Sequence, residues 1–276
     1  MGEMRPRILA IAGSDSGGGA GIQADLKTIT ALGGFGMSAL TALTAQNTLA
    51  VTAVHEVPPE FVAEQIDAVA SDIGVDAAKT GMLGTAAIVE VVAERLGAHG
   101  IDRLVVDPVM VSKGGARLLE ADAEETLRAR LLPLALVATP NLSEAGVLAG
   151  MRVGTLDEMR EAARRIAGLG SRHVLVKGGH LAGEPVDLLF DGRDFGEIVR
   201  PRIATENTHG TGCTYASAIA TYIGFGMAVP DAIERARDAV QRGLEKALPF
   251  GSGHGPLDHR AMCKEHEGRD TAKEQE

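Results

Sequence analysis

The sequence is poor in aromatic residues and contains no tryptophan. Phe, Trp and Tyr make up 3% of its 276 residues, so the interior has to be built from Ala, Val, Leu and Ile. Cysteine is also scarce, because only Cys213 and Cys263 occur and they lie far apart. Two distant cysteines form neither the disulfide framework of a small secreted protein nor a cluster with metal-ligand spacing.

A basic excess and a long apolar run are missing as well. The formal net charge is −10, and no basic cluster of the kind that binds nucleic acid is present. No apolar run approaches the roughly 20 residues that span a bilayer. The first run, Ile8–Ala12, is too short for a signal peptide. We therefore expect a cytoplasmic protein that has neither a nucleic acid nor a membrane as its partner.

Glycine, in contrast, is abundant, and the most informative glycines lie between Asn207 and Thr214. A Gly-Thr-Gly turn, formed by Gly210, Thr211 and Gly212, precedes small and apolar residues that predict a helix. A helix start of this kind presents unpaired N–H groups and the positive end of the helix dipole, so it favours phosphate. Cys213 would lie in the first turn, where the dipole favours its thiolate as a base or nucleophile. A plain glycine turn with a small buried cysteine is the structural alternative.

Apolar runs alternate with amphipathic segments along most of the chain. Strands are expected at 7–12, 35–45, 51–57, 77–80, 103–108, 135–138 and 173–176, helices at 22–32, 60–71, 85–96, 121–131, 142–148, 156–168 and 230–247, and a hairpin at 186–199. This order predicts an α/β protein with three α/β/α layers and a mostly parallel central sheet. We expect one domain over residues 1–258 and a charged, disordered tail over 259–276.

Polar or glycine-rich clusters follow the predicted strands, where ligands bind in parallel sheets. Phosphoryl transfer needs such clusters to position phosphates, a metal and a base. Asp107, Asn141 and Glu144 are candidates to organise Mg²⁺, mostly through water, and Lys177 and Thr208 are assigned to ATP. The structural alternatives are a capped strand end for Asp107, a capping box for Asn141 and Glu144, and a surface ion pair for Lys177.

The first predicted strand leads into a glycine-rich loop at residues 13–21. The loop has neither the lysine of a phosphate-binding Walker motif nor the spacing of a dinucleotide fingerprint. Asp15, near the start of the loop, and Asp25, just after it, are expected to orient a polar ligand, with a salt bridge or a helix cap as the alternative. The histidines, His180 and His209 among them, show no zinc spacing, and no hydrolase elbow occurs.

Seven motifs occur in one order along the chain. They are AGSDSGGGAGIQAD at 12–25, AQNT at 45–48, KTGML at 79–83, DPVM at 107–110, TPNLSE at 139–144, KGGH at 177–180 and NTHGTGCT at 207–214. With these motifs, the chain over about residues 7–258 closely resembles the hydroxymethylpyrimidine/phosphomethylpyrimidine kinases of thiamine biosynthesis, within the ribokinase-like superfamily.

The resemblance implies two phosphorylations at one site. ATP would phosphorylate the hydroxymethyl group of 4-amino-5-hydroxymethyl-2-methylpyrimidine, and the monophosphate would then become the diphosphate. The resemblance also implies Mg²⁺ as a cofactor and a homodimer. The Gly210–Gly212 turn would be the anion hole. Cys213 would be the base, where many superfamily members have Asp, with a thiol pKa lowered by the helix start.

The same resemblance implies which residues line the pyrimidine site, together with Cys213: Gly13, Asp25, Thr44, Gln46, Met82 and Val109. Gln46 has the amide donor and acceptor that an aminopyrimidine edge requires. Met82 offers a polarizable surface against the ring.

Two other functions are compatible with these residues. A pyridoxal or pyridoxine kinase of the same superfamily would turn over pyridoxal and not the pyrimidine monophosphate. A non-catalytic pyrimidine- or nucleotide-binding regulator would need a degraded base or a degraded Gly210–Gly212 turn, called the anion turn below. Both are intact in this sequence.

Overall fold

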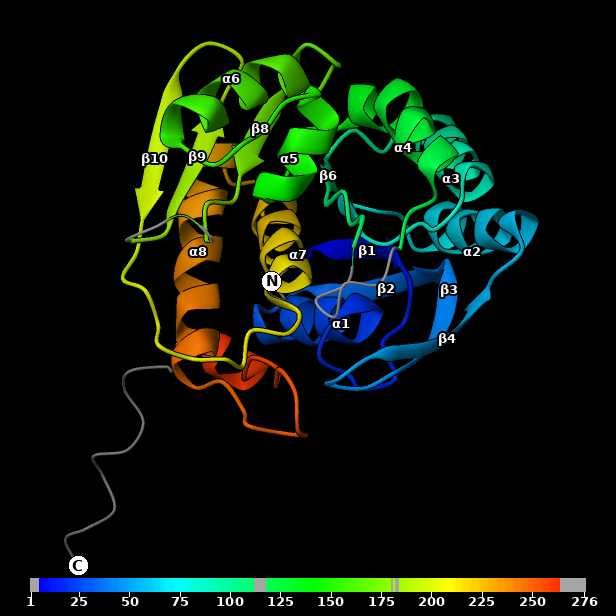
Figure 1. The fold of residues 1–276 in the computed structure, drawn as a ribbon. Coiled ribbons are helices and arrows are strands. Elements are labelled where there is room, and N and C mark those ends of the chain that lie inside the picture. Colours follow the sequence, from blue (N-terminus) through cyan, green and yellow to red (C-terminus); the bar gives the residue numbers. More distant parts are fainter. Residues whose placement is uncertain (1–4, 112–117, 180, 182–183, 264–276) are drawn as a thin grey trace, which may run out of the picture.

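The strands of the protein gather into one large sheet and one small one. In the computed structural model, which describes residues 5–111, 118–179, 181 and 184–263, the large sheet has the order β10-β9-β8-β7-β6-β5-β1-β2 (Figure 1). Its strands are β1 (Arg7–Ala12), β2 (Phe35–Leu40), β5 (Ala77–Thr80), β6 (Leu104–Val106), β7 (Val137–Ala138), β8 (His173–Val176), β9 (Val186–Phe190) and β10 (Phe195–Val199). In this order, each strand from β2 to β8 runs parallel to its neighbour. Strand β9 is antiparallel to both of its neighbours, β8 and β10.

Helices cover both faces of the large sheet. Because side chains alternate along a strand, Ile8 and Ala10 of β1 face one core and Leu9 and Ile11 face the other. The first core is closed by α1 (Gly21–Ala31), α7 (Thr211–Gly224) and α8 (Val229–Glu245). The second is closed by α2 (Pro59–Asp72), α3 (Ala86–Ala98), α4 (Ala121–Thr126), α5 (Leu142–Ala149) and α6 (Leu156–Ala167).

This arrangement confirms the predicted three-layer α/β/α fold with a mostly parallel sheet. Among the described residues, no helix combines the length and the apolar character that a membrane span needs. The prediction of a single domain over residues 1–258 stays a prediction.

Backbone hydrogen bonds tie the loops after the parallel strands into one edge. Gly81 N donates to Ile11 O at 2.9 Å, and Asp107 N donates to Thr80 O at 3.0 Å. Further along the edge, Lys177 N donates to Pro140 O at 2.8 Å. The polar motifs that follow these strands are therefore neighbours, as expected for the carboxyl ends of parallel strands.

The prediction of one strand over 35–45 is wrong. The chain leaves the large sheet after Leu40, which pairs with the last residue of β1, Ala12. It then enters β3 (Ala42–Gln46), which pairs only with the antiparallel β4 (Val51–Glu56) in a two-stranded sheet. The burial alternation shifts phase at this junction, where the consecutive residues Thr41 and Ala42 are both buried. The weak alternation in the sequence did not reveal this change of partner.

Two other boundaries differ from the prediction. The helix expected over 121–131 is α4 followed by a π-helical segment, Leu127–Leu131, and a 3₁₀ turn, Leu132–Leu134. The expected tail from 259 begins too early, because residues His259–Met262 form a 3₁₀ helix, η3, with His259 and Met262 buried. Because the region is rich in charged residues, the sequence did not indicate that His259 and Met262 are buried. Residues 264–276 lie outside the described part of the chain.

Candidate active site

The start of α7 is a bare turn packed against the glycine-rich loop. Gly210 is its N-cap, with φ of 80°, a conformation that favours glycine. A β-carbon on Gly210 would also collide with the carbonyl oxygen of Gly19. The Thr211 hydroxyl donates to Thr208 O at 2.8 Å, and within the described structure no side chain caps this helix. Thr211 N donates to Thr208 O at 3.3 Å, so among the described residues the next N–H groups, of Gly212 and Cys213, are the ones left for an anion.

An ion pair lies directly opposite this helix start. Lys177 Nζ is 2.7 Å from Asp107 Oδ1. A β-carbon on Gly212 would lie 3.4 Å from Lys177 Nζ and 3.6 Å from Asp107 Oδ2. The absence of a side chain at Gly212 therefore leaves the ion pair open to the turn. A cation and a helix N-terminus face the same small space, which suits a highly charged anion.

A second ion pair lies beneath Cys213 and is fully buried. Lys79 Nζ is 3.0 and 2.9 Å from the two carboxylate oxygens of Asp25, and neither residue is exposed. Ser217, one turn after Cys213 on α7, donates to Asp25 Oδ1 at 2.7 Å. Such a pair is tolerated in an interior when further hydrogen bonds satisfy it. The salt-bridged alternative for Asp25 is therefore what the structure contains, and its predicted contact with a pyrimidine stays a prediction.

The expected lowering of the Cys213 pKa by the helix start is wrong. Burial raises the pKa of the Cys213 thiol to about 11, although the charge of Lys79 opposes this rise. The carboxylates of Asp25 and Asp107 raise the pKa further. The desolvation that accompanies tight packing of a thiol outweighs the half-charge of a helix dipole.

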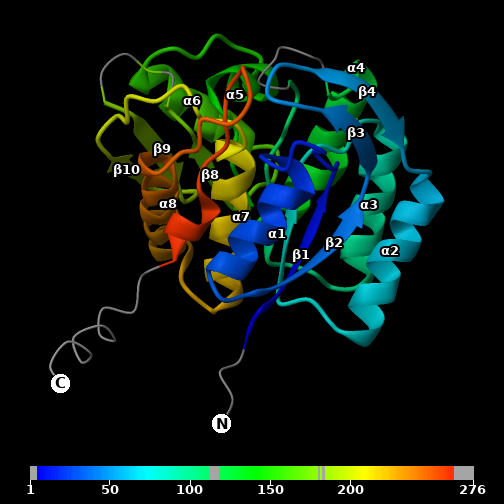
Figure 2. The ribbon, with the colours of Figure 1, turned by 90° about the horizontal axis from the view of Figure 1, so that it is seen from below.

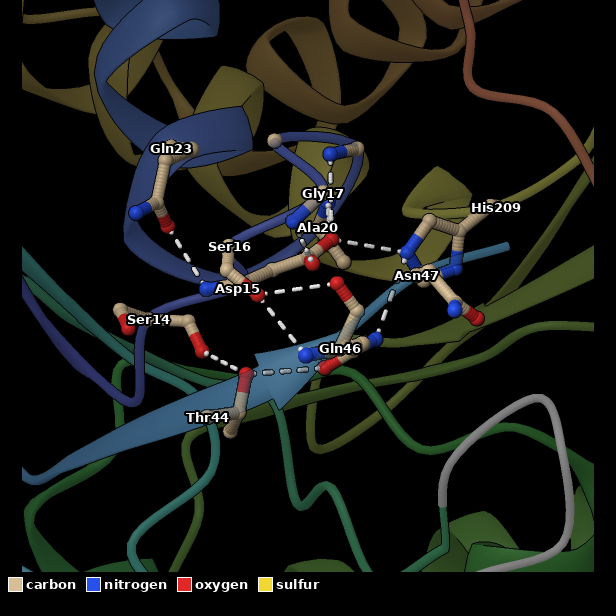
Figure 3. A network of polar contacts seen from close by, with 12 residues as sticks. Ser14, Asp15, Ser16, Gly17, Ala20, Gln23, Thr44, Gln46, Asn47 and His209 are labelled. Carbon is tan, nitrogen blue, oxygen red and sulfur yellow. Dashed lines mark hydrogen bonds and ion pairs between the residues drawn. The ribbon is translucent and has the colours of Figure 1, made fainter. Parts of the chain in front are cut away.

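Asp15 fastens the glycine-rich loop to the anion turn. Its carboxylate accepts hydrogen bonds from Gly17 N at 2.8 Å, Gly19 N at 3.0 Å and Ala20 N at 2.8 Å, and His209 Nε2 lies 2.8 Å from Oδ2 (Figure 3). Burial works to raise the pKa of Asp15, but the hydrogen bonds from His209 and the backbone lower it overall. Asp15 thus remains ionised and holds two loops in place through these contacts, and its predicted contact with a polar ligand stays a prediction.

Gln46 belongs to the same network. Its Oε1 accepts from Thr44 Oγ1 at 3.3 Å, and its Nε2 lies 3.4 Å from His209 Nε2 (Figure 3). Thr44 Oγ1 also lies 2.8 Å from Ser14 O. The structure therefore brings two of the predicted pyrimidine residues, on β3, next to the anion turn.

Met82 and Gly13 meet on the other side of this loop. Gly13 N donates to Met82 O at 3.2 Å, and a β-carbon on Gly13 would collide with Met82 Cε. A cavity of about 240 Å³ adjoins Met82 and is also lined by Thr41, Val54 and Leu119. Val109 follows the ion-paired strand end, and its N–H donates to Asp107 O at 2.8 Å.

Asn141 and Glu144 form a reciprocal capping box at the start of α5. Glu144 N donates to Asn141 Oδ1 at 3.0 Å, and Asn141 N donates to Glu144 Oε2 at 2.8 Å. Burial raises the pKa of Glu144 to about 7; Lys177 opposes the rise and Asp107 adds to it. The structural alternative named for these two residues is thus confirmed, and it does not exclude a second role.

The donor set fits a magnesium ion held mostly through water. The described residues contain no group of three or more His, Cys, Asp or Glu side chains placed to hold a metal. The buried carboxylate of Asp107 nevertheless adds to the rise in the pKa of Glu144, and a cavity of about 340 Å³ reaches Asn141 and Glu144. A hydrated cation would relieve that repulsion, and oxygen ligands with retained water are what Mg²⁺ prefers.

Sequence reasoning missed Lys79, Ser217 and His259 as parts of this region. A lysine in the otherwise apolar run of β5 was a usable signal, because a buried lysine requires a partner. The other two gave no signal, since a serine and a histidine in ordinary surroundings are uninformative. His180 lies outside the described residues.

The sequence as a whole matches known kinases. A family model described as phosphomethylpyrimidine kinase matches residues 15–258. The hydroxymethylpyrimidine/phosphomethylpyrimidine kinase of Bacillus subtilis is 49% identical over 258 residues, which are 93% of this chain and 95% of that protein. The thiamine biosynthesis bifunctional protein of Geobacter sulfurreducens is 56% identical over 256 residues, 92% of this chain. The chain spans only 52% of that longer protein.

The fold also matches a solved kinase structure. A Bacillus subtilis pyridoxal kinase in complex with ADP has a TM-score of 0.88 and 38% sequence identity, covering 94% of this chain and 99% of that one. The loops assembled at the carboxyl edge of the sheet thus occur on a scaffold known to bind an adenine nucleotide.

Proposed function

The chain belongs to the phosphomethylpyrimidine kinase family, and on that basis we propose that it acts in thiamine biosynthesis. It transfers the γ-phosphoryl group of ATP to the hydroxymethyl group of 4-amino-5-hydroxymethyl-2-methylpyrimidine and then to the resulting monophosphate. Both steps take place at the carboxyl edge of the sheet, where α7 begins.

The observation that carries this proposal is the meeting of Lys177, Asp107 and the bare start of α7. Phosphoryl transfer requires positioned positive charge around three phosphate oxygens more than it requires covalent chemistry. The N–H groups of Gly212 and Cys213 bind the transferring group, and Lys177 neutralises the nucleotide phosphates. These donors are already fixed by the fold, so little reorganisation accompanies the reaction.

The pyrimidine lies between the loop at Gly13, Met82 and the Thr44–Gln46 end of β3. Gln46 reads the aminopyrimidine edge through its amide, and the sulfur of Met82 packs against the ring. The hydroxymethyl group then points at the start of α7. Holding the acceptor oxygen in line with the γ-phosphorus supplies a large part of the rate.

In each step, a bond forms between the acceptor oxygen and the γ-phosphorus while the bond to the bridging oxygen of ADP breaks. The hydroxyl proton of the first acceptor passes to Cys213 Sγ, which accepts it as a thiolate. Because the pKa of this thiol is raised to about 11 by burial, the thiolate fraction and the rate both rise with pH through the neutral range. Lys79, together with a hydrogen bond from the backbone of Gly21, favours the thiolate form.

Magnesium would be held through water by Asp107, Asn141 and Glu144, and when bound it supplies charge neutralisation for the ATP phosphates. Asp107 accepts from Lys177 and Thr139, which fixes the direction of its second oxygen. Thr208 supports the nucleotide side of the turn through its carbonyl, which orients Thr211.

A pyridoxal kinase activity is the second candidate, because the pyridoxal kinase of Bacillus subtilis shares this fold at a TM-score of 0.88. The same edge of the sheet would then accept a pyridine ring that carries a hydroxymethyl group. The higher identity, 49%, to the pyrimidine kinase of that organism favours the pyrimidine.

We also propose a homodimer that works in the cytoplasm, where ATP is available. The outer face of the β3–β4 sheet exposes apolar side chains, with Leu43 47% exposed and Ala45 and Ala53 beside it. A two-stranded sheet is marginal without further packing, and a second copy would cover this face.

The test is ATP-dependent phosphorylation of the pyrimidine, its monophosphate and pyridoxal in parallel, with Cys213→Ala as the comparison. We expect turnover of both pyrimidines. In the wild type the logarithm of the rate should rise with pH, and in the variant this rise should be lost. Turnover of pyridoxal without either pyrimidine would contradict the substrate assignment. An unchanged pH profile in Cys213→Ala would contradict the base assignment alone.

A further inference from the structure

The C-terminal segment, defined here as residues 248–262, is fastened to the anion turn. His209 N donates to Gly255 O at 3.0 Å, and Gly255 N donates to Asn207 Oδ1 at 3.1 Å. His254 N reaches Thr48 O at 3.2 Å, just beyond the end of β3. The segment thus bonds to the two loops that flank the proposed pyrimidine site.

The segment ends in η3, which packs between α8 and α1 (Figure 2). From there, His259 Nε2 lies 3.0 Å from Thr214 Oγ1, in the first turn of α7 and next to Cys213. His259 is 7% exposed and Thr214 is fully buried. Burial lowers the pKa of His259 to about 4, with Lys27 acting in the same direction and Asp258 against it. The ring is therefore neutral at physiological pH.

Two other buried threonines in helices behave differently. Thr28 Oγ1 donates to Ala24 O at 2.7 Å, and Thr221 Oγ1 donates to Ser217 O at 2.7 Å. Both hydroxyls therefore bond to the carbonyl four residues earlier, a contact that bends helices. The equivalent acceptor for Thr214 is the carbonyl of Gly210, which accepts Thr214 N at 2.9 Å.

We propose that His259 is a positioning residue that holds the Thr214 hydroxyl away from the Gly210 carbonyl and so keeps the anion turn in its productive geometry. Without His259, the hydroxyl rotates onto Gly210 O, the first turn of α7 bends, and the N–H groups shift relative to Lys177. The inference rests on the proposed function for its kinetic consequence, but its structural consequence is independent of the substrate.

The kinetic test compares His259→Phe with the double variant His259→Phe/Thr214→Val. The single variant leaves the hydroxyl free to rotate, and we expect kcat for the pyrimidine to fall about tenfold with KM changed by less than about twofold. The double variant has no hydroxyl to rotate and two apolar groups in contact, so it recovers most of the lost kcat. Met262→Leu, a buried neighbour in η3, is the control and retains wild-type kcat.

His259→Asn provides a second variant, because its side chain is too short to reach Thr214 but stays polar; it should show the same loss. A crystal structure of either single variant provides a readout that does not depend on activity. We expect Thr214 Oγ1 within hydrogen-bond distance of Gly210 O. An unrotated hydroxyl, an unchanged kcat, or a double variant no better than the single would overturn the inference. An inactive wild-type enzyme with a rotated hydroxyl in the variant would overturn the proposed substrate and support the positioning role.

Discussion

At the scale of single residues, the site depends on what is missing as much as on what is present. Gly210 and Gly212 have no side chains, and this lets the turn touch Gly19 on one side and face Lys177 on the other. Two ion pairs, Lys177–Asp107 and Lys79–Asp25, both interact electrostatically with Cys213. Each pair keeps a lysine charged, Lys79 in a buried place and Lys177 in a half-buried one, where a lone lysine would lose its charge more readily.

Gly210→Ala should test the geometry of the turn. The substitution combines a φ of 80° with a collision against the carbonyl of Gly19, so the turn must shift. We expect kcat to fall about 100-fold, since displacements of about 1 Å have effects of that size. The measurement is steady-state kinetics beside a thermal melt.

Gly226→Ala is the matched control at the other end of α7. Gly226 has a φ of 86°, and no neighbouring atom lies within 4 Å of the position that a β-carbon would occupy there. The variant should lose about 1 kcal/mol of stability and keep its kcat. An equal loss of kcat in both variants would show that backbone strain, and not the position of the turn, explains the effect.

At the scale of elements, the ends of strands of two to six residues position the polar loops of the site, and the helices pack against these strands. Helices α5 and α6 each begin at a complete capping box, Asn141 with Glu144 and Thr155 with Glu158. The first box lies at the carboxyl edge of the sheet beside Lys177, through the bridge between Asn141 and Lys177. The second lies away from the site and has no proposed role in catalysis.

Asn141→Ala and Thr155→Ala form a matched pair for separating these roles. Each removes one N-cap hydrogen bond, so each should lower the free energy of unfolding by about 1 kcal/mol. Only Asn141→Ala should also weaken the use of magnesium ATP, which appears as a raised KM. Denaturant unfolding and nucleotide titrations measure both. Equal KM values would restrict Asn141 to its capping role.

The sequence predicts elements well where one property decides them. The run from Arg7 to Ala12 and the amphipathic helix α8 follow from local pattern, and the carboxyl-edge position of the motifs follows from strand order. Prediction from the sequence fails for features that are determined by residues far away in the chain. The split of 35–45 depends on where β1 ends, the ordering of His259 depends on Thr214, and the raised pKa of Cys213 depends on burial that no local pattern reports.

At the scale of the whole molecule, the sheet collects motifs from residues 12 to 214 at one edge. The strand order places β1 and β5 side by side toward the β2 end of the large sheet, with α7 packed across β1, β5 and β6. The anion turn at the start of α7 therefore lies near β1, β5 and β6, the strands that lead into Gly13, Gly81 and Asp107. Activity depends on this long-range assembly, because no single motif contains both the turn and its cation.

The most direct measurement of the central claim is kcat/KM for ATP with the hydroxymethylpyrimidine in the wild type and in Lys177→Met. We predict a loss of at least about 100-fold, as for removal of one preorganised electrostatic donor. Lys177→Met/Asp107→Asn, which avoids an unpaired buried carboxylate, should be no more active, and the exposed Lys246→Met should match the wild type. A folded Lys177→Met protein that retains wild-type kcat/KM would contradict the assignment of this edge as the phosphoryl-transfer site.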